Sequence, residues 1–185
     1  MNVFEQACIF AVERHSGMLR KGTQIPYITH PMEAAAIVAT MTTDCEILAA
    51  AVLHDVVEDT PTTLAEIEAR FGARVARLVA AESEDKRPEL PAELTWKLRK
   101  EETIERLRGT NDPAEKMLVI GDKLSNLRGL QRDYATLGEA VWSRFHVTDK
   151  ALHRWYYTAI AEATKELSDC AAWQEMNGLV KAIFE

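Results

Sequence analysis

The 185-residue sequence contains few of the residues that cross-link or interrupt a chain: 3 cysteines, 8 glycines and 6 prolines. Cys8, Cys45 and Cys170 are far apart, odd in number and never in a Cys-x-x-Cys spacing. This pattern argues against both a disulfide framework and a thiolate metal site. The apolar content of 47% is typical of a globular chain long enough to bury a sizeable core.

The sequence also lacks an excess of basic residues, a long apolar run and the pattern of a signal peptide in its first residues. Its net charge of −7 argues against a nucleic-acid binder, although a few local cations can still hold a small phosphorylated substrate. No apolar stretch is long enough to cross a bilayer, and residues 1–5 lack a basic start. We therefore expect a soluble cytoplasmic protein without nucleic-acid or membrane partners.

Strand patterns are absent as well, because no segment alternates apolar and polar residues with β-branched enrichment. The sequence predicts an all-α protein of about nine or ten helices, forming one domain over residues 1–185. The expected helices cover 2–16, 31–41, 47–59, 63–72, 73–82, 92–109, 113–131, 148–168 and 170–184. The polar, proline-punctuated segment 83–91 is the expected mobile loop. In the helix over 92–109, we expect the inner residues to be Leu94, Leu98, Ile104 and Leu107.

The helix over 47–59 is apolar on nearly every side until its last turn. There, His54, Asp55, Glu58 and Asp59 form one stripe at spacings i, i+1, i+4 and i+5. Four ionisable groups would cost several kcal/mol if they were buried without partners. Two interpretations remain open: a bound cation neutralises the stripe, or the last turn of an amphipathic helix reaches the surface.

A loop over residues 17–31 carries the cations Arg20 and Lys21 and ends at His30. A metal site from this inventory would combine His30, the His54–Asp55 pair and an acidic residue from a distant helix. Spacing alone does not identify that acidic residue. Asp122 lies in the middle of the predicted helix 113–131, where most aspartates are simply exposed. The aromatic run 155–157 is expected in the core.

Taken together, these residues resemble a known family. His30, His54–Asp55 and Asp122 follow the H…HD…D order of the HD-domain metal-dependent phosphohydrolases. The segments 20–22 and 26–31 are similar to the RKxG…PYxxHP motif of the RelA/SpoT hydrolase domain. Residues 53–60 are similar to its LHDVVEDT throughout, and residues 121–128 resemble its ADRLHNMR segment. Three ordered motifs are far more specific than one His-Asp dipeptide.

The resemblance implies a single HD-domain helical bundle and a set of site residues. His30, His54, Asp55 and Asp122 would hold one divalent cation, which is Mn²⁺ in this family, although the donors also suit Fe, Co or Zn. Glu58 and Asp59 would act as catalytic carboxylates on the nucleophilic water. Arg20, Lys21 and Asn126 would bind the substrate.

The implied activity is that of the small stand-alone alarmone hydrolases (Mesh type). These hydrolyse the 3′-pyrophosphate of guanosine 3′,5′-bis(diphosphate) or its pentaphosphate to give GDP or GTP and pyrophosphate. Four departures from the motifs affect the expected base pocket: one extra residue between Arg20 and His30, Met18 in place of Gln, Gly121 in place of Ala and Ser125 in place of His. They motivate an alternative, a phosphatase for another nucleotide such as a deoxynucleoside monophosphate or NADPH. A minor alternative is a non-catalytic nucleotide sensor.

Overall fold

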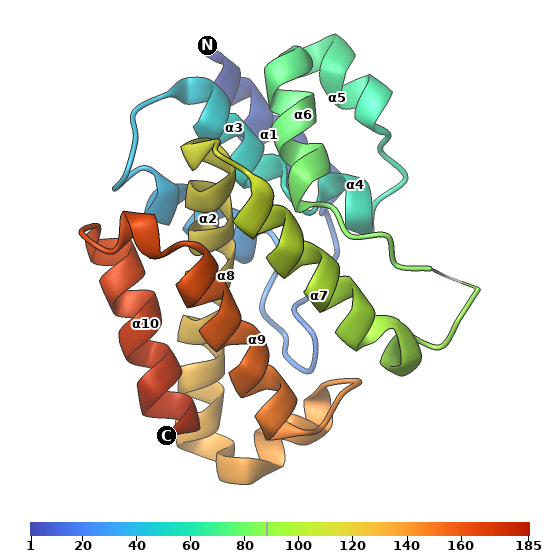
Figure 1. The fold of residues 1–185 in the computed structure, drawn as a ribbon. Helices are drawn as coiled ribbons and strands as arrows, with labels where there is room; N and C mark the ends of the chain where they lie inside the picture. Colours follow the sequence, from blue (N-terminus) through green and yellow to red (C-terminus); the bar gives the residue numbers. More distant parts are fainter. Residues whose placement is uncertain (88) are drawn as a thin grey trace. The chain divides into compact units, whose positions relative to one another are not determined.

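The computed structural model describes residues 1–87 and 89–185, and this part of the chain is helical (Figure 1). The helices are α1 (Val3–Arg14), α2 (Thr29–Val38), α3 (Cys45–Leu53), α4 (Val56–Asp59), α5 (Leu64–Phe71), α6 (Ala73–Glu82), α7 (Ala92–Gly109), α8 (Pro113–Leu137), α9 (Lys150–Ala163) and α10 (Ala171–Phe184), with two 3-10 helices, η1 (Gly138–Arg144) and η2 (Lys165–Leu167). Among the described residues, the only β-type pairing is an isolated bridge between Leu19 and Pro26. The predicted all-α fold class is confirmed.

The chain divides into two compact units. The first comprises Met1–Ser83 and Asp112–Ser125, and the second comprises Glu84–Asn111 and Asn126–Glu185. Helix α8 therefore contributes its first half to one unit and its second half to the other. A single domain over 1–185 stays a prediction.

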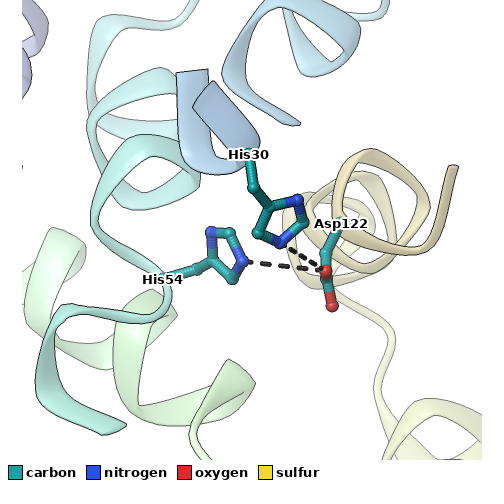
Figure 2. A group of neighbouring side chains, drawn as sticks. All are labelled: His30, His54 and Asp122. Atoms are coloured by element: carbon teal, nitrogen blue, oxygen red, sulfur yellow. Dashed lines mark ion pairs between the residues drawn. The ribbon is translucent and has the colours of Figure 1, made fainter. Parts of the chain in front are cut away.

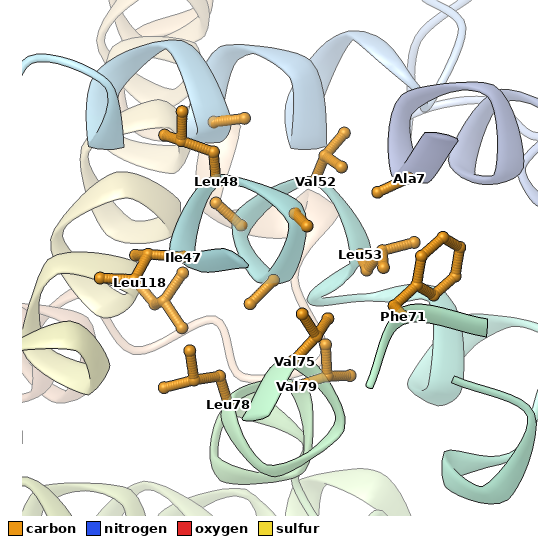
Figure 3. Close-up of a cluster of buried hydrophobic side chains, with 14 of the residues drawn as sticks. Ala7, Ile47, Leu48, Val52, Leu53, Phe71, Val75, Leu78, Val79 and Leu118 are labelled. Carbon is orange, nitrogen blue, oxygen red and sulfur yellow. The ribbon is translucent and has the colours of Figure 1, made fainter. Parts of the chain in front are cut away.

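Helix α3 forms the centre of the first unit. All of its residues from Ile47 to Leu53 are buried, and it packs against α1, α2 and α6. Figure 3 shows Val75 and Val79 of α6 directed toward α3. An apolar helix without a polar face can be stable only inside such a core. Burying each large aliphatic side chain contributes about 1.5–3 kcal/mol, so this core holds the ends of α3 firmly in place.

The predicted helix over 47–59 is wrong in one respect: it breaks at His54 and Asp55. Helix α3 ends at Leu53, and α4 begins at Val56. Nδ1 of His54 lies 2.8 Å from the carbonyl oxygen of Ala51, the acceptor that the amide of Asp55 would use in a continuous α-helix. The His54 ring forms a hydrogen bond with that carbonyl in place of the Asp55 amide, and the backbone turns at this point.

Side-chain caps fix where several helices begin. Asp44 and Thr63 accept hydrogen bonds from backbone amides of the first turns of α3 and α5, at 2.9 and 3.2 Å. Asp112 accepts from the amide of Ala114 at the start of α8, at 2.9 Å. Aspartate and threonine are residue types favoured at this position, so these three helix starts can be read from the sequence. The helix expected over 148–168 begins at Lys150, with Asp149 as its cap.

In the second unit, α9 packs against α7 and α10. The expected inner positions of α7 are half wrong: Ile104 and Leu107 are buried, but Leu94 is 74% exposed and Leu98 is 48% exposed. The packed face is formed instead by Trp96, which lies against Tyr156, and by Lys100. By helical spacing, Leu94 and Leu98 lie opposite these two residues.

The aromatic run 155–157 contributes to the core of the second unit, as predicted. Tyr156 is 3% exposed. His153, one turn earlier, lies among Trp96, Trp142 and Phe145, with ring centroids 4.9–5.4 Å away. Helix α8 continues to Leu137, beyond the predicted end at 131, and η1 follows it directly.

The expected mobile loop over 83–91 includes residue 88, which lies outside the described residues. Its described part contains no helix or strand. Glu84 in this segment pairs with Arg99 at 2.9 Å and with Lys100 at 2.6 Å. Across the described ranges 1–87 and 89–185, the helices are too short or too polar to cross a bilayer.

Candidate metal centre

Three helical segments of the first unit deliver the four predicted metal ligands to one place. His30 is the second residue of α2, His54 and Asp55 occupy the turn between α3 and α4, and Asp122 lies in the first half of α8. His30, His54 and Asp122 are buried. The core around α3 therefore fixes His54 and Asp55 relative to the segments that carry the other two ligands.

The polar atoms of His30, His54 and Asp122 face one another (Figure 2). Nε2 of His30 lies 3.1 Å from Oδ1 of Asp122, and Nε2 of His54 lies 3.7 Å from the same oxygen. Oδ2 of Asp55 is 3.0 Å from Nε2 of His54 and 3.5 Å from Nε2 of His30. Potential ligand atoms of His30, His54 and Asp122 all lie within 4.8 Å of one another. This spacing suits one cation among them.

The opposite nitrogen of each histidine ring has a partner outside this group. Nδ1 of His54 faces the carbonyl oxygen of Ala51, which can only accept, so this nitrogen carries the proton. Its Nε2 is buried and makes no hydrogen bond to any described residue, despite the nearby Asp55 oxygen. Nδ1 of His30 lies 2.9 Å from Oγ of Ser125. Metal-binding histidines are typically held in this way, with the second nitrogen donating to an outer partner.

The charges at this place balance one another. Burial disfavours the charged form of His54, but the carboxylates of Asp55 and Asp122 outweigh this effect and raise its pKa well above the ordinary value. Burial by itself would raise the pKa of Asp122, but the Lys123 ammonium and the two histidines hold it well below its usual range. Two ionised carboxylates and two imidazoles, without a thiolate, fit a hard or borderline divalent cation.

Tyr27 is a site residue to which sequence reasoning gave no role. Its hydroxyl donates to Oδ2 of Asp55 at 2.6 Å. Burial, followed by the nearby carboxylates of Asp55 and Asp59, raises the pKa of Tyr27 far above its ordinary value, so it remains a donor. The ring of His15 packs against Tyr27 with centroids 5.0 Å apart. The position of Tyr27 within the PYxxHP segment was the available signal.

Two of the four departures from the motifs lie somewhere other than expected. A Cβ on Gly121 would lie 2.6 Å from Cγ2 of Val38 and 2.9 Å from the carbonyl oxygen of Ala34, so α8 approaches α2 closely at this glycine. Ser125 is buried behind His30 and donates to Glu33. Both residues therefore shape the contact between two ligand-bearing helices, where we had expected them to shape the base pocket.

The remaining predicted site residues lie outside this group of four side chains. Glu58 and Asp59 are half-buried in α4, and Asp59 interacts with the Tyr27 hydroxyl. Arg20 is half-buried and Lys21 exposed in the loop between α1 and α2. The amide of Arg20 donates to the carbonyl of Ile25 at 2.9 Å. Asn126 follows Asp122 by one turn of α8 and belongs to the second unit. The roles of these five residues stay predictions.

Comparison with known proteins assigns the chain to a family. A family model described as "HD domain" matches residues 7–147. The chain belongs to the HD-domain family. The mouse protein named guanosine-3′,5′-bis(diphosphate) 3′-pyrophosphohydrolase MESH1 is 36% identical to this HD-domain chain over 184 residues, covering 97% of this chain and 92% of the relative. An Aquifex aeolicus protein named guanosine-3′,5′-bis(diphosphate) 3′-pyrophosphohydrolase is 39% identical over 126 residues, covering 68% of this chain and 17% of its own length.

Solved structures agree with this assignment. The crystal structure of lmo0812 from Listeria monocytogenes superposes with a TM-score of 0.74 at 36% identity, covering 88% of this chain and all of that one. A structure described as "A metazoan ortholog of SpoT hydrolyzes ppGpp and plays a role in starvation responses" gives a TM-score of 0.76 at 25% identity, covering 98% and 96%. The HD-domain likeness thus extends into the last third of the chain, which the sequence motifs did not reach.

Proposed function

We propose that this HD-domain protein is a metal-dependent hydrolase of guanosine 3′,5′-bis(diphosphate) and its pentaphosphate, releasing pyrophosphate and leaving GDP or GTP. The observation that carries the proposal is the convergence of His30, His54, Asp55 and Asp122, of which all but Asp55 are buried. The names of the mouse and Aquifex relatives support the choice of substrate. We place the activity in the cytoplasm, in keeping with the composition.

His30, His54, Asp55 and Asp122 would hold one divalent cation, for which we propose Mn²⁺. The fit rests on the buried, unsatisfied Nε2 of His54 and on the absence of thiolates from the donor set. When bound, the cation supplies the positive charge that lowers the pKa of a water molecule and offsets charge on the phosphates. Tyr27 would hold the Asp55 carboxylate through its hydroxyl.

Glu58 and Asp59 would act as the catalytic carboxylates that handle proton transfer from the attacking water. Both lie in α4, which starts directly after the His54–Asp55 turn. The backbone amide of Asp59 donates to the carbonyl of Asp55 at 2.9 Å, so the two carboxylates are one helical turn apart. Glu58 would accept the water proton on a carboxylate oxygen, while Asp59 would share the Tyr27 hydroxyl.

Arg20, Lys21 and Asn126 would bind the substrate. In this acidic chain, the two loop cations supply local positive charge for a highly charged nucleotide. Guanidinium and ammonium groups are the usual protein partners of phosphate oxygens. Asn126 offers an amide donor and acceptor for the ribose or phosphate region.

The test is product analysis with guanosine 3′,5′-bis(diphosphate) as substrate. The purified protein is stripped of metal with a chelator and assayed before and after Mn²⁺ is restored. We expect GDP and pyrophosphate in equal amounts only after Mn²⁺ is added. Intact substrate with the metal-loaded protein would overturn the proposed function. A panel of deoxynucleoside monophosphates and NADPH would then identify the alternative phosphatase, which releases phosphate and no pyrophosphate.

A further inference from the structure

Behind the candidate metal centre, two side chains continue from the His30 ring. Oγ of Ser125 lies 2.9 Å from Nδ1 of His30 and donates its proton to Oε2 of Glu33 at 2.8 Å. Ser125 is only 1% exposed and His30 only 3% exposed. Neither Ser125 nor Glu33 is among the predicted site residues.

The order of these bonds fixes which nitrogen of His30 carries a proton. A carboxylate only accepts, so the single hydroxyl proton of Ser125 points to Glu33. The lone pairs of Ser125 must then accept from Nδ1–H of His30. Nε2, which faces Asp122 at 3.1 Å, is left with its lone pair available to a cation. A histidine whose outer nitrogen is tied in this way is oriented and made a better metal donor.

His54 obtains the same tautomer from a backbone carbonyl, which no substitution can remove. His30 depends on two side chains instead. They also lie on the two helices that carry metal ligands: Glu33 follows His30 by three residues in α2, and Ser125 follows Asp122 by three in α8. The close approach at Gly121 brings these two helices together. The hydrogen bonds therefore join α2 to α8 at the point where both ligands emerge.

We propose that Ser125 and Glu33 are positioning residues that hold His30 in its Nδ1–H form and thereby set the affinity of the site for a divalent cation. Serine supplies both functions needed at this position, a donor toward Glu33 and an acceptor toward His30. The inference rests on the proposed metal site and assigns a role to residues that the proposed function does not use.

The experiment measures Mn²⁺ affinity directly, by electron paramagnetic resonance of the free ion during titration of the metal-free protein. We expect Ser125→Ala to weaken Mn²⁺ binding roughly 10- to 100-fold, the usual effect of losing an outer partner of a metal-bound histidine. Glu33→Gln keeps the side-chain size and removes the charge, so we expect a smaller loss. In the double variant, the Glu33→Gln change should add nothing to the loss of Mn²⁺ affinity in Ser125→Ala, because the proposed effect of the carboxylate on His30 passes through the hydroxyl.

Two further measurements separate positioning from simple loss of stability. Ser16→Ala and Glu13→Gln make the same chemical changes at exposed positions of the first unit, and both should bind Mn²⁺ like the wild type. In the Zn²⁺-loaded protein with isotope-labelled histidine, His30 should show a protonated Nδ1 that exchanges slowly with solvent. This signal should disappear in Ser125→Ala.

The Mn²⁺ affinities of these variants can support or overturn the inference. The inference is overturned if Ser125→Ala binds Mn²⁺ with wild-type affinity. It is also overturned if the affinity losses of Ser125→Ala and Glu33→Gln add up in the double variant. If Ser125→Ala does not fold, Glu33→Gln decides by itself, and unchanged affinity there overturns the role of the carboxylate. A wild-type protein that binds no Mn²⁺ would instead overturn the proposed function.

Discussion

The two histidines of the candidate metal centre show how one residue type can be held by different means. His54 is oriented by the carbonyl of its own preceding turn, at 2.8 Å from Ala51. His30 is oriented from another helix, by Ser125. A local hydrogen bond of the first kind follows from a few neighbouring residues, whereas the second requires the packing of α2 and α8. The presence of a histidine predicts a metal ligand, whereas the hydrogen-bond partners around the ring determine which nitrogen carries the proton.

The Glu58 carboxylate gives the sharpest test of the proposed proton transfer. We expect Glu58→Gln to retain its bound metal and to lower kcat roughly 10²- to 10⁴-fold, because the amide cannot accept the water proton. Metal content and steady-state kinetics measure the two effects separately. Glu68→Gln, at an exposed position of α5, is the matched control and should be fully active. Near-normal turnover in Glu58→Gln would remove this residue from the proposed role.

Arg20 is expected to act on substrate binding. Arg20→Ala should raise KM about tenfold or more with a smaller change in kcat, since a charge-assisted hydrogen bond contributes about 1.5–3 kcal/mol. Steady-state kinetics with guanosine 3′,5′-bis(diphosphate) provide the measurement. Arg108→Ala removes an exposed arginine of α7 and should leave KM unchanged. An unchanged KM in Arg20→Ala as well would exclude Arg20 from the substrate site.

At the scale of elements, the contact between α2 and α8 depends on Gly121. Gly121→Ala would place a methyl group 2.6 Å from Val38 and 2.9 Å from a backbone oxygen of Ala34. We expect a loss of about 1–3 kcal/mol in unfolding free energy, together with weaker metal binding because Asp122 moves with α8. Urea denaturation and Mn²⁺ titration measure the two effects.

The control for this substitution is Gly178→Ala in α10, where an added Cβ meets nothing within 4 Å. Alanine is the better helix former by up to about 1 kcal/mol, so this variant should be neutral or stabilised. Similar stability changes at the two glycines would show that α8 does not approach α2 as closely as the structure indicates.

The aromatic packing around α9 predicts a pH dependence of stability. Burial lowers the pKa of His153, whose Nε2 lies 2.7 Å from the carbonyl oxygen of Val147. The unfolded chain then binds more protons than the folded one, so this contribution to stability is full above the ordinary histidine pKa of about 6.5 and is lost as pH falls below it. The denaturation midpoint of the wild type should therefore fall more steeply than that of a His153 variant as the pH is lowered from 8 to 5.

His153→Phe should make stability less dependent on pH. The substitution also removes the hydrogen bond to Val147. His146→Phe changes an exposed histidine nearby and should keep the wild-type slope. Burial also lowers the pKa of His15, so a residual slope is expected in His153→Phe. Equal slopes in the two variants would contradict the prediction.

At the scale of the whole molecule, metal binding can test the predicted single domain. All four tryptophans, Trp96, Trp142, Trp155 and Trp173, belong to the second unit, while the candidate metal centre lies in the first. Mn²⁺ at 100 times its Kd should stabilise the folded state by about 2.7 kcal/mol. If the chain unfolds as one domain, tryptophan fluorescence and far-ultraviolet circular dichroism should shift together. A shift in circular dichroism alone would show that the units unfold separately.

The Asp122→Asn variant is the control for that experiment. It removes one charge from the ligand set, so we expect much less bound metal and little stabilisation by Mn²⁺. Stabilisation equal to the wild type would place the bound cation elsewhere.

Features that depend on neighbouring residues could be predicted from the amino-acid sequence. Helical periodicity predicted the all-α class, Asp44, Thr63 and Asp112 predicted helix starts, and the ordered motifs identified the family. The other features arise from tertiary packing. It broke the helix at His54, exposed Leu94 and Leu98, and placed Gly121 and Ser125 behind the ligands. These features depend on which surfaces meet, and residues 95 positions apart, such as His30 and Ser125, leave no periodic signal of their contact.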